Sequence, residues 1–545
     1  MQDTPTGVTN PAVPDVESSL LEREVARRRT FAIISHPDAG KTTLTEKLLL
    51  YAGAIELAGA VRGRKNRRHA TSDWMELEQQ RGISMTSAAL EFELQGCRVA
   101  LLDTPGHRDF SEDTYRALMA ADSVVMVIDA AKGVEEQTRK LFDVCRRQRL
   151  PILTFINKLD QPSLDPMELL DDLERTLGIA AAPVNWPIGS ADRFRGVYDI
   201  AGTALRLYER ESQGQYRAPV RVSSLDDPSF HELIGDLALR ELRESLDLLG
   251  VAGTRFDETE YRAGRQTPVF FGSALANFGL EPFLDALITL APSPAPRETT
   301  GGSIAPTDAR FTAFVFKIQA NMDPRHRDRV AFIRVCSGRF TKDMSLHNSR
   351  LGRTLRASRA YRFFGRERET IEAAYAGDII GLVNPGQLAI GDTLHDGGGA
   401  LQFPELPRFP PEHFGVVRLT DLRHKQFDGG LRQLEEEGLM QVYFAAAGVR
   451  EPLVGVVGAL QFDVIVSRLA NEYGVKAEIQ PSSYVAARWL DVEMPARSIP
   501  VTGNIALAKD RLDRSVLLFG STWELQYFER QYPTIRLLVE PPPRR

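Results

Sequence analysis

The sequence predicts a multidomain α/β and β protein: a doubly wound α/β sheet with an inserted subdomain, then an antiparallel β-barrel, then a C-terminal α/β sandwich domain. The chain has 545 residues, which is too many for a single hydrophobic core. Short apolar runs alternate with amphipathic segments up to about residue 291, whereas segments of alternating hydrophobicity follow from residue 311. Stretches rich in proline and glycine separate these regions.

The composition is typical of a soluble globular protein, with 43% hydrophobic and 26% charged residues and a net charge of −6. No apolar run approaches the ~18–20 residues needed to cross a bilayer, and the N-terminus has no secretory signal. Residues 1–25 are expected to form a disordered extension. The three cysteines form no C-x-x-C pair, so we expect a cytoplasmic protein without a disulfide framework or zinc site.

The doubly wound domain is expected at residues 26–295. Strands buried on both faces are continuously apolar, and ligands bind at their carboxyl ends. Such runs, each ending in a motif, are 98–102, 123–129 and 151–157. Roughly 110 residues then precede the next motif, far more than one βαβ unit needs. We therefore predict an insertion around 161–265, including a helix at 230–249.

A linker rich in proline and glycine begins at residue 292, and the β-barrel is expected at residues 306–400. Its predicted strands are 311–319, 329–336, 370–374 and 378–383. Gly397 to Gly399 marks the next boundary, and residues 403–540 mix strand and helix patterns, as in an α/β sandwich domain. Helices are expected there at 431–438 and 460–472, with an extended segment at 442–444.

The most informative segment runs from Phe31 to Thr43. An apolar strand and a tight turn precede Gly40, Lys41 and Thr42 at the start of a helix, which is the pattern of a phosphate-binding loop. Lys41 is expected to bridge the β- and γ-phosphates, and Thr42 to give an oxygen to Mg²⁺. The residues predicted to bind nucleotide here are Ser35, His36, Pro37, Asp38, Ala39, Gly40, Lys41, Thr42 and Thr43. A simple glycine turn between core elements is the alternative, which the later motifs disfavour.

A second motif follows the next apolar strand and consists of Asp103, Thr104, Pro105, Gly106 and His107. Asp103 can reach Mg²⁺ through water, and the Gly106 N–H can donate to the γ-phosphate, so that hydrolysis would release the following segment. His107 is placed to orient an attacking water, and we predict that it is the catalytic residue. Ser84 is the expected further Mg²⁺ ligand, with Thr86 as the alternative.

The third motif reads the base and consists of Asn157, Lys158, Leu159 and Asp160. The Asp160 carboxylate can accept hydrogen bonds from guanine N1–H and N2–H₂, a pattern that adenine lacks. Asn157 is expected to tie loops together, and Lys158 to lie along the ring. Ser273, Ala274 and Leu275 follow another apolar run and would place a backbone N–H on guanine O6. Together these motifs favour GTP over ATP.

These motifs resemble those of the translational GTPases, the group that contains elongation factors Tu and G. Within it the chain is most similar to the bacterial peptide chain release factor 3 family, from about residue 22 to near the C-terminus. The segments that carry the closer resemblance are 34–43, 69–75, 109–116, 185–189, 316–323 and 454–463. Pro37 and Ile83 match positions that form an apolar gate beside the catalytic histidine in the group.

The resemblance implies a monomeric, ribosome-stimulated GTPase that promotes dissociation and recycling of class I release factors after translation termination. Its cofactors would be GTP or GDP and Mg²⁺, and its partners the ribosome (rRNA and ribosomal proteins) and class I release factors, with no membrane. Two alternatives stay open: another translational GTPase activity, such as translocation or ribosome protection, and a GTP-binding scaffold without hydrolysis. The basic run at 62–68 fits either a solvated face or contact with RNA.

Overall fold

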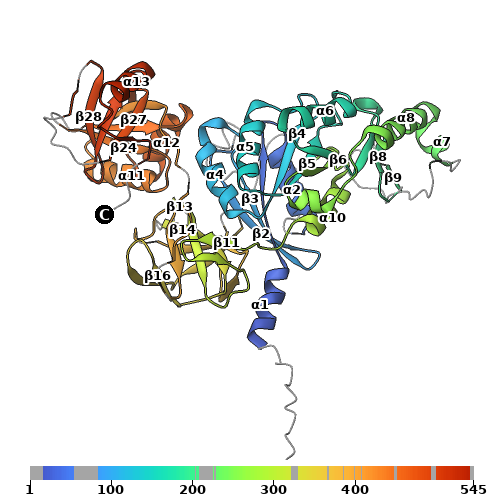
Figure 1. Cartoon of the computed structure of the whole chain (residues 1–545), viewed down its shortest axis with the longest axis horizontal. Coiled ribbons are helices and arrows are strands. Elements are labelled where there is room, and N and C mark those ends of the chain that lie inside the picture. The colour runs from blue at the N-terminus through green and yellow to red at the C-terminus, as the bar shows by residue number, and fades with distance from the viewer. Residues whose placement is uncertain are drawn as a thin grey trace, which may run out of the picture.

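Three domains make up the described part of this computed structural model (Figure 1). We refer to residues 26–295 as the G domain, 306–400 as the barrel domain and 403–540 as the C-terminal domain. The predicted basic run and the segments 69–75 and 81–83 lie outside the described residues. The structure describes residues 16–53, 84–202, 204–207, 225, 229–320, 329–364, 367–384, 386–397, 399, 401–406, 408–446, 451–491, 499–501 and 503–540.

The G domain contains a twisted sheet in the order β2-β3-β1-β4-β5-β10-β6, in which every neighbouring pair is parallel except β2 and β3. Every residue of β4 and β5 is buried, because helices cover both faces of the sheet. The predicted doubly wound domain is confirmed. The strands are β1 Arg28–Ser35, β2 Ala88–Leu94, β3 Cys97–Asp103, β4 Ser123–Asp129, β5 Ile152–Asn157, β6 Ala180–Pro183 and β10 Gln266–Phe271, and the helices are α2 Lys41–Tyr51, α4 Ser111–Ala120, α5 Glu136–Arg147, α6 Pro166–Leu177 and α10 Leu280–Leu290.

The inserted segment differs in two ways from the prediction. Its first part consists of α6 and β6 and is part of the doubly wound fold, because β6 pairs with β10 in the main sheet. The remainder holds a three-stranded antiparallel sheet followed by short helices, and Gly235, with φ of 81°, splits the single helix predicted at 230–249. These elements are β7 Asn185–Ile188, β8 Gly196–Asp199, β9 Ala204–Leu207, α7 Ser229–Ile234, α8 Asp236–Ala252 and α9 Glu258–Arg262.

The sequence predicts a disordered extension over residues 1–25, and this prediction is wrong for the last part of the segment. Residues Val16–Ala26 form helix α1. The helix has little amphipathic pattern of its own, but Leu21 and Val25 are buried and the Glu24 carboxylate pairs with Arg28 at 2.9 Å. Tertiary contacts therefore stabilise a helix that the local sequence pattern does not predict.

The barrel domain is built from antiparallel strands, with Phe, Ile and Val side chains in its core. It is the predicted β-barrel, and the predicted linker before it folds back as the hairpin β11 Arg297–Thr299 and β12 Gly302–Ile304. Its strands are β13 Thr312–Ala320, β14 Arg329–Ser337, β15 Arg339–Thr341, β16 Ser345–Asn348, β17 Arg353–Arg356, β18 Ala360–Phe364, β19 Glu367–Thr370, β20 Ala373–Tyr375, β21 Ile379–Val383 and β22 Thr393–His395.

The C-terminal domain packs helices α11, α12 and α13 on an eight-stranded antiparallel sheet in the order β26-β23-β25-β24-β28-β29-β27-β30. Its fold class is the predicted one, although the helix expected at 431–438 begins at His424. The elements are β23 His413–Leu419, α11 His424–Glu436, β24 Gln441–Ala445, β25 Pro452–Val456, α12 Leu460–Tyr473, β26 Ala477–Pro481, β27 Ala486–Leu490, β28 Ile505–Asp510, β29 Ser515–Phe519, α13 Thr522–Gln531 and β30 Leu537–Leu538.

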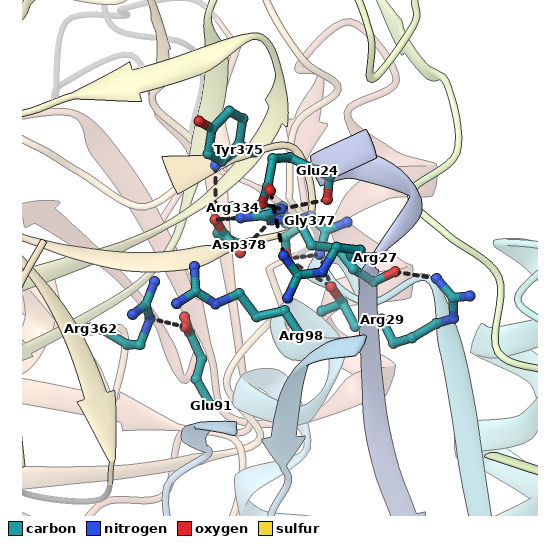
Figure 2. A network of polar contacts seen from close by, with 12 residues as sticks. Glu24, Arg27, Arg29, Glu91, Arg98, Arg334, Arg362, Tyr375, Gly377 and Asp378 are labelled. Carbon is teal, nitrogen blue, oxygen red and sulfur yellow. Dashed lines mark hydrogen bonds and ion pairs between the residues drawn. The ribbon is translucent and has the colours of Figure 1, made fainter. Parts of the chain in front are cut away.

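A buried ionic network joins the G domain to the barrel domain (Figure 2). Arg28 at the start of β1 donates to both oxygens of Asp378, at 2.8 and 2.9 Å, and both side chains are at most 3% exposed. Arg334 of β14 donates to the Gly377 carbonyl at 2.8 Å and pairs with Asp122 of the G domain. The two domains thus share buried charges in addition to apolar contacts.

Candidate nucleotide site

The predicted motifs converge on one edge of the G-domain sheet. Ser35 ends β1, Asp103 ends β3 and Asn157 ends β5, and parallel pairing brings these carboxyl ends together. Ser273 follows β10 at the same edge. Loops at this edge are where ligands bind in doubly wound sheets.

The phosphate-binding loop has the backbone conformation that its sequence suggests. Asp38 and Gly40 both have positive φ, at 66° and 96°, and Gly40 caps the N-terminus of α2. A Cβ added at Gly40 would lie 2.2 Å from Asn157 Nδ2, so the position has no room for a side chain. The helix that follows directs its N-terminal N–H groups at the loop, where they suit an anion.

Lys41 and Asp103 form an ion pair at the centre of the loop, with Lys41 Nζ 2.5 Å from Asp103 Oδ1. Both side chains are buried, and the other carboxylate oxygen of Asp103 has no hydrogen-bond partner among the described residues. A buried carboxylate oxygen without a partner suits Mg²⁺, which prefers oxygen ligands, and Thr42, the residue after Lys41, carries a hydroxyl oxygen.

Asn157 links two loops, as the sequence predicts. Its Nδ2 donates to the Ala39 carbonyl at 2.8 Å, and its Oδ1 accepts the Ala274 N–H at 2.8 Å. The phosphate loop and the loop of Ser273 to Leu275 are therefore held by one side chain. Because the Ala274 N–H is engaged, it would contact guanine O6 only by sharing or exchanging this bond.

The predicted base-reading end contains one residue outside the predicted motifs, Asp129 at the end of β4. Its Oδ2 lies 2.8 Å from Lys158 Nζ, and Lys158 has a positive φ of 72°. The position of Asp129 at the carboxyl end of a buried apolar strand is the sequence feature that could have identified it as a site residue. Asp160 Oδ1 is buried without a partner among the described residues, as a carboxylate that accepts hydrogen bonds from a ligand would be.

The second motif is tied to the sheet on both sides. Thr104 Oγ1 donates to the Ile33 carbonyl at 2.5 Å, and Thr114 Oγ1 of α4 donates to the Pro105 carbonyl at 3.0 Å. His107, 31% exposed, caps the short 3₁₀ helix η2, Arg108–Phe110, and its Nδ1 accepts the Asp109 N–H at 3.2 Å. The loop around Gly106 and His107 is therefore held in place.

Ser84 and Thr86 precede β2, which is paired with β3 so that Ala88 lies opposite Asp103. This register brings the segment toward the same edge as Asp103. The barrel domain holds the segment there, because Lys317 Nζ lies 2.5 Å from the Ser87 carbonyl and 3.2 Å from Asp113 Oδ2 of α4. Within the described residues, no cluster of three or more His, Cys, Asp or Glu side chains could bind a metal ion.

Family models match each of the three domains. The Elongation factor Tu GTP binding domain matches residues 26–293, and Elongation factor G domain 2 matches residues 310–397. The model of the Class II release factor RF3, C-terminal domain, matches residues 403–529. Peptide chain release factor 3 of Gloeobacter violaceus is 52% identical over 96% of this chain and 99% of its own length. The chain belongs to the peptide chain release factor 3 family.

Other members of the release factor 3 family agree with this placement. The proteins of a Cyanothece and a Synechocystis species are each 51% identical to this chain, over 95% and 96% of it respectively. A crystal structure of a Thermus thermophilus protein superposes with a TM-score of 0.67 and 25% identity, covering 89% of this chain and 73% of that one. The chain is a translational GTPase that acts in termination, and it binds GTP or GDP.

None of the helices in the described ranges is long and apolar enough to cross a membrane. All three cysteines have free thiols; Cys145 and Cys336 are buried, as expected for core residues, and Cys97 is partly exposed.

Proposed function

We propose that the protein is a ribosome-stimulated GTPase that promotes the dissociation and recycling of class I peptide chain release factors after termination. It would act as a monomer in the cytoplasm, with the ribosome and class I release factors as partners. The observation that carries the proposal is the position of His107, directly after Gly106 and on a loop whose neighbours contact both other domains. A change of domain arrangement on the ribosome can therefore reach the reacting groups.

The nucleotide would lie along the convergent loops. The β-phosphate would be enclosed by residues 35–42, with Lys41 released from Asp103 to bind the phosphates. Asp160 would accept the guanine N–H groups, while Asn157 keeps the loops in register. Discrimination against adenine follows because a mismatched base would leave the buried Asp160 oxygen unpaired, at a cost of about 1–3 kcal/mol.

Mg²⁺ would be bound by Thr42 and Ser84 hydroxyls and, through water, by Asp103. When bound, it supplies charge neutralisation of the β- and γ-phosphates. The residues of this chain would do the rest: Lys41 would balance the phosphate charge, the Gly106 N–H would donate to the γ-phosphate, and His107 would orient the attacking water.

The proposal is tested by single-turnover GTP hydrolysis with and without ribosomes carrying a class I release factor, while release-factor dissociation is followed in parallel. We expect strong stimulation by ribosomes together with GTP-dependent loss of the release factor. His107→Ala should keep GTP affinity and lower the stimulated rate by about 10²–10⁴-fold. Stimulation without release-factor loss would favour another translational GTPase activity, and no stimulation would contradict the proposal.

A further inference from the structure

Asp109 contacts both the predicted catalytic histidine and the C-terminal domain. Its backbone N–H donates to His107 Nδ1 at 3.2 Å, and its Oδ1 lies 3.3 Å from the same nitrogen. Its Oδ2 accepts the Leu460 N–H at 2.8 Å. Leu460 is the first residue of α12, where the helix leaves N–H groups for an external acceptor. One carboxylate therefore joins the histidine to a helix 351 positions away in the chain.

Gly458 provides an independent sign that this contact is built into the fold. A Cβ added at Gly458 would lie 2.1 Å from Asp109 Cγ and 2.3 Å from Asp109 Cβ. Its backbone does not have the positive φ that would itself call for glycine. The glycine is thus explained by the close approach of Asp109.

Apolar packing closes the junction around this link. Phe110, Met85 and Val464 form a cluster, each at most 3% exposed, and Leu439 and Leu460 pack against it. Met85 precedes β2, Phe110 follows Asp109, and Val464 lies on α12. Loops from both sides of the nucleotide site thus meet the C-terminal domain in a water-excluding contact, in which a hydrogen bond is worth more than at an exposed surface.

The contacts at Nδ1 also bear on which nitrogen of His107 carries the proton. One nitrogen cannot accept and donate at the same time. A neutral ring can accept the Asp109 N–H at Nδ1 and carry its proton on Nε2, or it can donate Nδ1–H to the Asp109 carboxylate and leave Nε2 as an acceptor. Asp109 therefore faces the nitrogen that sets what the ring offers to the reaction at Nε2.

We propose that Asp109 is a positioning residue through which the C-terminal domain controls His107. The Leu460 N–H fixes the carboxylate, and Asp109 fixes the orientation of the imidazole. Separation of the C-terminal domain from the G domain would remove the Leu460 N–H from Asp109 and leave the carboxylate beside the ring free to move. This inference rests on the proposed catalytic role of His107.

The test uses the full-length protein and measures ribosome-stimulated hydrolysis, the ribosome KM and GTP affinity for four variants. Asp109→Ala removes the link, Asp109→Asn keeps an oxygen acceptor for Leu460, and Gly458→Ala displaces Asp109 from the other side. Gly429→Ala on α11 is the matched control, because its added Cβ would meet no atom within 4 Å. Thermal unfolding checks that each variant is folded.

We expect Asp109→Ala and Gly458→Ala to lower the hydrolysis rate by about tenfold or more, with GTP affinity and ribosome KM within about twofold of the unmodified protein. Asp109→Asn should recover most of the rate, and Gly429→Ala should behave as the unmodified protein. A rate unaffected by Asp109→Ala, or an Asp109→Asn as slow as Asp109→Ala, would overturn the inference.

The double variant His107→Ala/Asp109→Ala separates this inference from the proposed function. If Asp109 acts through His107, its removal should have no further effect once the imidazole is gone, and additive losses would overturn the inference. If His107→Ala alone leaves hydrolysis unaffected, the proposed catalytic role fails instead.

Discussion

At the scale of single residues, Asn157 and Gly40 show how tightly the nucleotide site is assembled. Asn157 uses its amide nitrogen for the Ala39 carbonyl and its amide oxygen for the Ala274 N–H. The same amide fills the space beside Gly40, and this explains the glycine as much as its backbone angle does. Site geometry is therefore fixed by neighbours within the site itself.

Gly40→Ala should weaken GTP binding by at least about tenfold, because the new methyl group both meets Asn157 and strains a left-handed backbone. Binding of a fluorescent GTP analogue measures this effect. Gly53→Ala is the control, since Gly53 also has a positive φ but a Cβ there would meet no atom within 4 Å. Equal losses in the two variants would show that backbone strain alone is responsible.

Asp160→Asn should change the preferred base from guanine to xanthine. The carboxylate accepts two N–H groups of guanine, whereas the amide nitrogen of Asn can donate to the C2 oxygen of xanthine. Hydrolysis of GTP should fall by about 10²-fold or more, and hydrolysis of xanthosine triphosphate should rise. Competition between the two nucleotides measures the switch, and an unchanged preference would remove Asp160 from the base site.

At the scale of elements, α4 is held from the barrel side by an ion pair. Lys317 of β13 lies 3.2 Å from Asp113 of α4, and the Ser87 N–H donates to the same carboxylate oxygen. Burial would raise the pKa of Asp113, but Lys317 and the Ser87 N–H outweigh it and leave the pKa below its ordinary value. The Asp113 carboxylate is thus kept in its charged form, and its contacts hold α4 against the barrel domain.

Helix α1 and the start of β1 are held by the barrel domain through Arg28. Arg28→Ala leaves the buried Asp378 carboxylate without the cation that pairs with it, and breaking a buried pair in this way costs about 3–5 kcal/mol. The thermal midpoint should therefore fall clearly. Arg27→Ala is the control, because Arg27 is 42% exposed and its ion pairs are long, at 3.5 and 4.0 Å. Similar midpoints in the two variants would contradict a stabilising role for the buried pair.

At the scale of the whole molecule, the domains meet through charged as well as apolar contacts. Glu91 of β2 pairs with Arg362 of the barrel, Arg468 binds Glu437 at 2.6 Å within the C-terminal domain, and the Ala320 N–H donates to the same Glu437 at 3.0 Å. The three domains are thus connected by a few ionisable groups, whose charge states contribute to the stability of the protein.

Glu91 should make stability depend on pH near neutrality. Burial, and then the nearby Asp378, raises the pKa of Glu91 from its ordinary 4.5 to about 7, although Arg362 and Arg98 oppose the shift. The folded protein therefore holds an extra proton between these values, so this contribution to stability is full below pH 4.5 and is lost as the pH rises through 7.

Glu91→Gln stays neutral at every pH, and its thermal midpoint should vary less between pH 5 and 8 than that of the unmodified protein. Glu93→Gln on the same strand is the control, because the Glu93 side chain is 64% exposed. Parallel pH curves for the unmodified protein and Glu91→Gln would show that Glu91 does not titrate in this range.

Sequence patterns alone predicted the three-domain order, the fold class of each domain and the motifs at the carboxyl ends of β1, β3 and β5. These features follow from local patterns: continuous apolar strands, short motifs of fixed spacing, and glycine in the phosphate loop. Boundaries were less accurate, since the predicted insertion included α6 and β6.

The pairing of residues that are distant in the chain became visible only in the folded protein. Glu24 of helix α1 pairs with Arg28, which the barrel domain binds in turn, Lys158 is held by Asp129 of another strand, and Asp109 meets Leu460. No periodicity or motif spacing encodes such pairings, because each joins residues that are far apart in the chain and meet only when the protein is folded. Local sequence patterns thus predicted the candidate nucleotide site, and long-range packing connects its residues to the rest of the protein.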